Sequence, residues 1–186
     1  MSTSVKLLKV RLSFPDLFEA TQYEGKGAYR YNASFLIEPG SNNDKNIKAA
    51  IQEAAAEKFG KKAQVKLSEW AGNSNKNCYV NGDTKEYDGY AGMLVLSAHR
   101  RQQDGRPLVI DGNKQPLTAS DGKPYAGCYV NATVDFYATG APNEGIRCGL
   151  KGVQFDSDGD AFSGSKVATP DEFDDLSEKG DGSDLV

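Results

Sequence analysis

The stretch Lys123–Gly140 constrains the fold more than any other part of the chain, because its residues alternate between two chemical types. Successive side chains of a β-strand point to opposite faces, so this alternation predicts a strand with two different faces. One face would be apolar and belong to a core: Cys128, Val130, Ala132, Val134, Phe136 and Ala138. The other face would carry rings and hydrogen-bonding groups: Tyr125, Tyr129, Asn131, Thr133, Asp135 and Tyr137.

The three tyrosines on that second face have two interpretations. Flat rings among hydrogen-bonding groups suit a surface that stacks on nucleobases. Alternatively, Tyr125, Tyr129 and Tyr137 fill a second apolar layer with their hydroxyls at its edge, which is the commoner role of any single tyrosine. Three rings on one face favour the stacking surface.

The length of 186 residues favours one well-buried domain over two. The chain has 20 glycines, nine tyrosines and eight phenylalanines, which indicates a β-rich domain with many turns. No apolar run reaches the length of a membrane span, and the first residues do not resemble a signal peptide, so we expect a cytoplasmic protein. The three cysteines and single histidine lack the spacing of a zinc site; we expect no metal and no cofactor.

Shorter periodic stretches predict the other strands. The first covers Val5–Phe14, ends at Pro15 and presents Lys9 and Arg11 outward. Its inward residues would be Leu8, Val10, Leu12 and Phe14. Further strands are expected at Tyr29–Ile37, Tyr90–Ser97, Leu108–Ile110 and around Ile146–Lys151, with a short one near Val65 and Leu67. Because Tyr90–Ser97 is apolar on both faces, it is either buried on both sides or closes a barrel.

A change of period predicts one helix, over Asp44–Phe59. Its apolar residues recur at intervals of three and four, Asn43 or Asp44 can cap its start, and Gly60 follows its end. We interpret its apolar stripe as a lid on the β core. The segment Asp16–Gly27, before the second strand, is expected to be a loop.

Charge is divided unevenly along the chain. The net charge is -4, but residues 171–186 contain seven acids and one base and therefore carry -6. The preceding residues have 21 bases and 19 acids, which leaves the body of the chain at +2. A mildly basic body with an acidic tail points to nucleic acid or another charged partner. Residues 1–168 are therefore expected to form the domain, and residues 169–186 a disordered acidic tail.

Outward bases and aromatic rings supply the candidate contacts to a nucleic acid. The residues expected to contact phosphates are Lys9, Arg11, Arg30, Arg100, Arg101, Arg147 and Lys151. The residues expected to stack on bases are Trp70, Tyr125, Tyr129 and Tyr137. Two alternatives remain open: Trp70 packs in the core, and Arg100 with Arg101 forms only a solvated hairpin.

The order of these elements resembles that of the single-stranded DNA-binding proteins of tailed phages. The resemblance rests on Val10–Pro15, Tyr31–Ile37, Tyr125–Ala132 and Gly149–Phe155, together with the acidic tail. It implies a mainly β fold: an OB-like, Greek-key, five-stranded barrel with one capping helix and extra hairpins. It also implies non-specific binding of single-stranded DNA in replication, recombination or repair, in the cytoplasm of a host cell.

In this family the acidic tail competes with DNA and recruits replication proteins such as a polymerase, helicase or primase. The resemblance therefore assigns partner binding to the acids of the tail: Asp171, Glu172, Asp174, Asp175, Glu178, Asp181 and Asp184. Family tails often end in an aromatic residue, whereas this chain ends in Leu185 and Val186.

Two other classes of function are alternatives. An oligomeric structural or interaction protein could bind protein or sugar through the tyrosine-rich face, and it would show no salt-sensitive affinity for DNA. An enzyme is disfavoured, because the sequence has no phosphate-binding loop and no nucleophile motif, and His99 lies beside two arginines.

Overall fold

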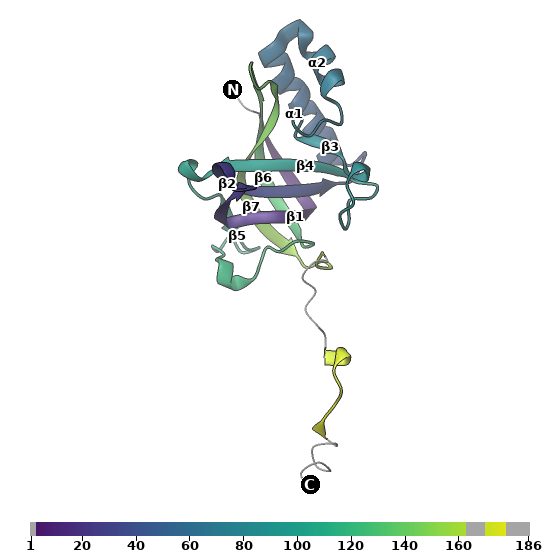
Figure 1. The fold of residues 1–186 in the computed structure, drawn as a ribbon, viewed down its shortest axis with the longest axis vertical. Helices are drawn as coiled ribbons and strands as arrows, with labels where there is room; N and C mark the ends of the chain where they lie inside the picture. Colours follow the sequence, from purple (N-terminus) through teal and green to yellow (C-terminus); the bar gives the residue numbers. More distant parts are fainter. Residues whose placement is uncertain (1–2, 163–169, 178–186) are drawn as a thin grey trace.

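A computed structural model describes residues 3–162 and 170–177. The strands are β1 (Thr3–Tyr23), β2 (Lys26–Ile37), β3 (Tyr79–Asn81), β4 (Leu94–Arg101), β5 (Leu108–Ile110), β6 (Tyr129–Thr139) and β7 (Gly145–Ser157). The helices are α1 (Asn42–Phe59) and α2 (Ala63–Trp70). Figure 1 shows the strands wrapped around one another, with both helices at one end of the barrel.

Five strands close the barrel. The strand order β3-β4-β2-β1-β6-β7-β5 is completed by a pairing between β4 and β7, so that β1, β2, β4, β6 and β7 form a ring. The closing contact is a parallel bridge between His99 and Gly149, and the other pairs of the ring are antiparallel. This is the OB topology. Of the two roles expected for Tyr90–Ser97, barrel closure is observed, but the strand is β4, which begins at Leu94 and continues to Arg101.

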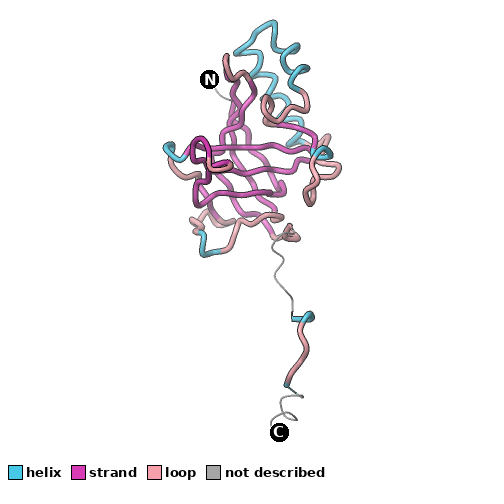
Figure 2. Tube along the Cα trace, in the orientation of Figure 1, coloured by secondary structure: helices cyan, strands magenta, loops and turns pink. Residues whose placement is uncertain are grey.

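The extra strands lie at the margins of the ring. The short strand β3 pairs with β4, and β5 pairs with β7. Figure 2 shows loops and short helical turns around the strands of the barrel. The expected apolar strand at Leu108–Ile110 is therefore confirmed, with the same bounds.

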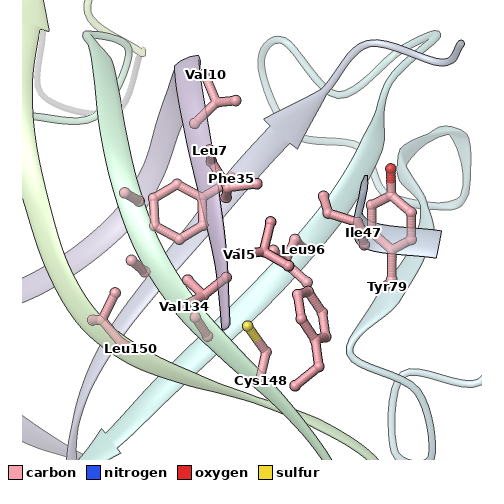
Figure 3. Close-up of a cluster of buried hydrophobic side chains, with 14 of the residues drawn as sticks. Val5, Leu7, Val10, Phe35, Ile47, Tyr79, Leu96, Val134, Cys148 and Leu150 are labelled. Carbon is pink, nitrogen blue, oxygen red and sulfur yellow. The ribbon is translucent and has the colours of Figure 1, made fainter. Parts of the chain in front are cut away.

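The core fills the barrel interior. Along β6 the residues from Val130 to Phe136 alternate between buried and half-buried, as the opening pattern predicted. Figure 3 shows residues of β1, β2, β4, β6 and β7 meeting inside the ring, with Ile47 of α1 closing one end. Ile146, Cys148 and Leu150 of β7 are also buried. The apolar faces predicted for Val130–Phe136 of β6 and for Ile146, Cys148 and Leu150 of β7 are thus confirmed.

The face of β1 was partly predicted wrongly. Leu7, Val10 and Leu12 are buried, whereas Leu8 is 57% exposed and Phe14 is 54% exposed. The register between β1 and β6 shifts between Leu7 and Val10, and Lys9 in this bulge has a φ of 50°. A bulge inserts an extra residue and reverses the alternation beyond it.

The strand β1 also passes the proline that was expected to end it. It continues to Tyr23 and pairs with β2 across the tight turn of Glu24 and Gly25. The segment expected to be a loop is therefore the outer half of a long, irregular hairpin. Pro15 is accommodated because the register between β1 and β2 shifts between Ser13 and Asp16, so its missing N–H breaks no regular ladder.

The helical region is larger than expected. The expected helix is confirmed as α1, but its N-cap is Ser41, whose side chain accepts a hydrogen bond from the Asp44 N–H. The strand expected near Val65 and Leu67 is wrong, since both belong to α2. Ala63 and Trp70 are buried against α1, and this packing favours a helix over a strand in this segment. Val65 is 60% exposed.

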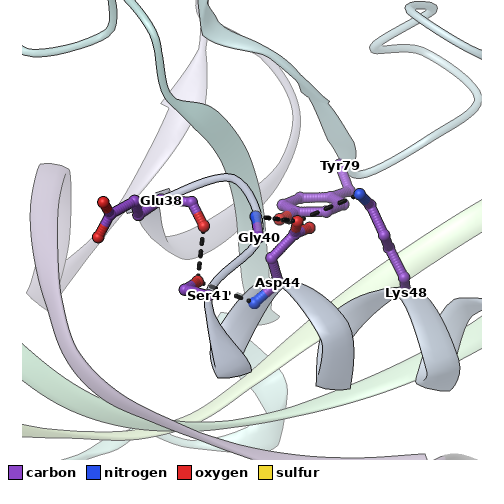
Figure 4. A network of polar contacts seen from close by, with 6 residues as sticks. All are labelled: Glu38, Gly40, Ser41, Asp44, Lys48 and Tyr79. Carbon is purple, nitrogen blue, oxygen red and sulfur yellow. Dashed lines mark hydrogen bonds and ion pairs between the residues drawn. The ribbon is translucent and has the colours of Figure 1, made fainter.

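A network of polar groups fixes the start of α1 (Figure 4). The buried Asp44 carboxylate accepts hydrogen bonds from Gly40 N–H at 2.8 Å, Tyr79 Oη at 2.8 Å and Lys48 Nζ at 3.1 Å. Burial alone would raise the pKa of Asp44, but these donors outweigh it and hold the pKa below its ordinary value. The network therefore anchors the helix to β3.

Candidate nucleic-acid interface

The largest of three described cavities lies over the seam where β4 meets β7. Its volume is about 1090 Å³, and its walls come from β2, β4, β6 and β7, residues 74–76 and residues 140–143. Six bases line it: Arg30, Lys76, Arg100, Arg101, Arg147 and Lys151. Only two carboxylates, Asp104 and Asp135, oppose them, which leaves four positive charges in excess with His99 neutral. We call this space the basic cavity.

The basic cavity brings together six of the residues that the sequence nominated: Arg30, Arg100, Arg101, Tyr137, Arg147 and Lys151. They come from four different strands, and the ring closure makes them neighbours. Lys76 was missed, because it lies in a polar segment without periodicity, and only its packing beside β7 gives it this position.

The bases differ in how they are held. Arg147 donates hydrogen bonds to the Asn75 carbonyl at 2.8 Å and the Asn143 carbonyl at 3.3 Å, so it ties together two loops of the cavity wall. Arg100 donates to the carbonyls of the turn after β4, and Arg101 pairs with Asp104 at 2.9 Å. The side chains of Arg30 and Lys76 have no hydrogen-bond or ion-pair partner in the described part of the chain. These two are the bases best placed to take an anion without first breaking a contact.

An aromatic ring stands among these charges. Tyr137 is 40% exposed and lies beside Gly149, where a Cβ would be 3.9 Å from the tyrosine Cε1. Gly149 has no side chain that could contact this ring. The basic cavity therefore combines cationic groups with a stacking surface, the two components of single-strand recognition.

His99 lies at the barrel closure and lines the basic cavity as well as a second one. Its Nδ1 is 2.7 Å from Asn32 Oδ1, while Asn32 Nδ2 donates to the Asp16 carboxylate at 2.9 Å. This arrangement assigns the proton to Nδ1, because the amide oxygen must accept. Desolvation by the cavity walls and the charges of Arg30 and Arg147 lower the pKa of His99, so the ring is neutral at pH 7.

The helical region supports one wall of the basic cavity. Lys66 of α2 forms an ion pair with Glu144 at 2.8 Å, and its ammonium lies 5.0 Å from the centre of the Phe59 ring and 5.7 Å from that of Trp70. Glu144 belongs to the loop between β6 and β7, of which Gly140, Pro142 and Asn143 line the cavity. The helices thus position a loop of the candidate interface.

A second open cavity, of about 780 Å³, lies at the hairpin between β1 and β2 and shares Arg30, Ser97 and His99 with the basic cavity. Its lining includes residues that were not nominated: Phe14, Tyr23, Lys26, Lys85 and Tyr87. Phe14 was predicted to lie in the core because the alternation of apolar residues along the first strand does not reveal the bulge. Tyr23 and Lys26 flank a Glu-Gly turn, and this turn was the one feature of the sequence that indicated a hairpin here.

The other nominated residues lie elsewhere. Lys9 and Tyr129 line none of the three described cavities, and Tyr125 lines a third one, of about 490 Å³. Tyr137 lies eight positions after Tyr129, about 26 Å along an extended strand, so the two rings do not form one surface. Placing all nominated residues in one groove was therefore wrong, and DNA contact by these residues elsewhere stays a prediction.

Arg11 and Trp70 have structural partners. Arg11 donates hydrogen bonds to the Gly127 carbonyl at 2.9 Å and the Asp160 carbonyl at 2.6 Å, and its guanidinium lies 4.3 Å from the centre of the Phe162 ring. Trp70 is 7% exposed and packs edge to face on Phe59 at 5.6 Å. The nomination of Trp70 as a stacking platform is wrong, because its ring faces are covered.

The acidic tail is described only in part. Residues 170–177 are exposed and include a short 3-10 turn at Pro170–Glu172. The exposed acids among them are Asp171, Glu172, Asp174 and Asp175. The remaining nominated acids, Glu178, Asp181 and Asp184, lie outside the described residues. Within the described residues, no helix is long and apolar enough to cross a membrane.

Two solved structures with a similar fold are phage proteins. The single-stranded DNA-binding protein of bacteriophage Enc34, solved in complex with single-stranded DNA, superposes with a TM-score of 0.71 and 20% identity, covering 86% of this chain and 89% of that protein. The single-stranded DNA-binding protein gp2.5 of bacteriophage T7 has a TM-score of 0.58 and 11% identity, over 93% of this chain and 98% of that protein. At these identities the likeness establishes the OB-like fold alone.

Sequence comparison goes further. A protein described as putative protein p50, from Acyrthosiphon pisum secondary endosymbiont phage 1, is 53% identical over 176 residues, which cover 93% of this chain and 94% of that protein. The sequence model of a family described as the single-stranded DNA-binding protein of Enterobacter phage Enc34 matches residues 3–184. The chain therefore belongs to the Enc34 family of phage single-stranded DNA-binding proteins.

Proposed function

We propose that this protein binds single-stranded DNA without regard to sequence and protects exposed strands during the replication, recombination or repair of phage DNA. The observation that carries the proposal is the basic cavity, where six bases and the ring of Tyr137 converge on the seam of an OB barrel. Membership of the family supports it.

The position of the basic cavity on the barrel supports the same function. OB folds bind oligonucleotides on the face of their second and third strands, between the loops that join strands one and two and strands four and five. Here the second and third barrel strands are β2 and β4, and the loop between β6 and β7 is the last of these loops. The basic cavity is lined by both strands and by this loop.

The chemistry of the lining explains the expected lack of sequence preference. Guanidinium and ammonium groups contact phosphates, which are the same in every sequence, and a tyrosine ring stacks on any base. Arg30 and Lys76 would contact phosphates directly, while Arg147 would hold the loops that shape the cavity. A duplex hides its base faces, so a site that uses stacking favours single strands.

The acidic tail extends the proposal. A segment of charge -6 tethered to a basic cavity is present there at a high effective concentration and competes with phosphates. DNA that occupies the cavity releases the tail for a replication protein, such as a polymerase, helicase or primase. Both roles depend on the negative charge of the tail. The acids of residues 170–177 are exposed, as both roles require.

Titration of a labelled oligo-dT and of a duplex of equal length, at several salt concentrations, tests the proposal. We expect tighter binding of the single strand, with a slope of log affinity against log salt of about -0.7 for each phosphate neutralised. Equal affinity for both forms, or an affinity that does not depend on salt, would contradict it.

A further inference from the structure

Phe14 is held on the surface by an unfavourable backbone conformation. Its φ is 45°, in the left-handed region that bulky side chains rarely adopt, and it lies where the register between β1 and β2 shifts. The preceding residue, Ser13, points inward and its hydroxyl accepts a hydrogen bond from the buried Tyr90 hydroxyl at 3.0 Å. The bulge therefore turns a large apolar ring outward, and 54% of Phe14 is exposed. Both the left-handed backbone and the exposure of an apolar ring to water are unfavourable. A ligand that covers the ring would explain why it is held in this position.

A second exposed ring lies against Phe14. The ring centres of Phe14 and Tyr87 are 4.8 Å apart at an interplanar angle of 73°, and Tyr87 is 52% exposed. Behind them Tyr90 is only 2% exposed, with its ring centre 5.2 Å from that of Tyr87 and 6.5 Å from that of Phe14. The buried ring holds the two exposed rings in a fixed edge-to-face arrangement. We call Phe14 and Tyr87 the aromatic pair.

The aromatic pair lines the second cavity, which shares Arg30, Ser97 and His99 with the basic cavity. The two cavities differ in charge. The second one has three bases, Lys26, Arg30 and Lys85, and two carboxylates, Asp16 and Glu24, for a surplus of one positive charge. It also contains Tyr23, which is 81% exposed. An anionic chain attracted to the basic cavity would thus pass Arg30 and reach a neighbouring surface suited to flat rings.

We propose that the aromatic pair stacks on nucleobases of the same DNA strand whose phosphates occupy the basic cavity. This inference rests on the proposed function and adds a second stacking site beyond Tyr137. Exposed rings with fixed geometry bind any base through its π face, and they lose little side-chain entropy when they do so. The shared lining with the basic cavity, and the surplus of positive charge in both cavities, favour DNA over an apolar peptide or a second copy of the chain as the occupant.

The test compares two ligands and two tyrosines. Tyr87→Ala is measured against oligo-dT and against an abasic oligonucleotide of equal length, which carries the same phosphates but no bases. The matched control is Tyr29→Ala, because Tyr29 is 49% exposed and lines none of the three described cavities. We expect Tyr87→Ala to weaken oligo-dT binding by about 5- to 150-fold, the range for one stacked base, and to leave the abasic affinity unchanged. Tyr29→Ala should change neither.

The controls separate failure of this inference from failure of the proposed function. If the unsubstituted protein binds neither ligand, the proposed function is wrong. If it binds oligo-dT but Tyr87→Ala weakens both ligands equally, or neither, the stacking site is overturned. Tyr87→Leu keeps an apolar contact with Phe14 and Tyr90 while removing the π face, so it should show the same selective loss even if the alanine variant does not fold. A change in the sedimentation of the free Tyr87→Ala protein, without a selective loss, would instead assign the aromatic pair to self-association.

Discussion

The start of α1 and the basic cavity differ in whether their charged groups are paired within the protein. At the helix, one buried carboxylate, Asp44, accepts hydrogen bonds from three donors and pairs with Lys48. In the basic cavity, six bases face two carboxylates, and Arg30 and Lys76 have no side-chain partner in the described chain. The helix network is complete within the protein, whereas the basic cavity holds an excess of one sign.

The difference indicates which region serves stability and which serves binding. A buried charge is tolerated only when its hydrogen bonds and its counter-charge are supplied, so the Asp44 network is expected to stabilise the fold. Like charges that line an open cavity repel one another, and they focus a field that attracts anions. Substitutions in the two regions should therefore separate into effects on unfolding and effects on DNA affinity.

The largest expected effect concerns stability alone. Trp70→Ala removes a buried indole that packs on Phe59, and a substitution of this kind costs about 3 to 5 kcal/mol of unfolding free energy. Urea denaturation measures it, and Val65→Ala, at a 60% exposed position on the same helix, is the control. A folded Trp70→Ala protein of normal stability but reduced DNA affinity would restore the stacking role that the sequence suggested.

The next effect concerns DNA affinity alone. Arg30→Ala removes a base that lines both cavities, and the loss of one charge-assisted contact should weaken oligo-dT binding by about 1.5 to 3 kcal/mol. The salt slope should also become shallower by about 0.7. Arg106→Ala removes the same charge at an exposed position outside the three cavities and should leave the affinity nearly unchanged. Equal losses in both variants would mean that net charge, and not the cavity, binds DNA.

The third effect returns to the helix. Tyr79→Phe removes one donor to the buried Asp44 carboxylate and should cost about 1 to 3 kcal/mol of unfolding free energy at pH 7, with no change in DNA affinity. Because the pKa of Asp44 is lowered in the folded state, its contribution is complete above the ordinary value of 3.8 and is lost as the pH falls through the folded value. The difference between the two proteins should therefore shrink in acid, which urea denaturation at pH 7 and pH 3 would measure. A difference that grows in acid would contradict this account.

The smallest effect is expected from the tail. Deletion of residues 171–186 should leave the thermal midpoint nearly unchanged and tighten oligo-dT binding at low salt more than at high salt, because the Debye length falls to about 8 Å at physiological ionic strength. Parallel titrations of the full-length and truncated proteins would measure this. Identical affinities at low salt would show that the tail does not compete for the basic cavity.

Local sequence patterns predicted the regular strands well. The alternation in β6 and in the inner half of β2 matches the observed burial, since each of these strands has one face on a single core. The same reasoning failed in β1, where two left-handed residues, Lys9 and Phe14, interrupt the alternation. It failed again at α2, where packing of Trp70 on Phe59 outweighs a weak local preference.

The sequence by itself determined the β-rich class, the capping helix, the division of charge and six of the residues in the basic cavity. These properties depend on periodicity and composition, which are local. Only the tertiary structure decided which bases are neighbours, that Trp70 is buried, and that Phe14 and Tyr87 meet on the surface. Those outcomes depend on barrel closure between β4 and β7 and on bulges in β1, which join residues far apart in sequence and leave no periodic signal.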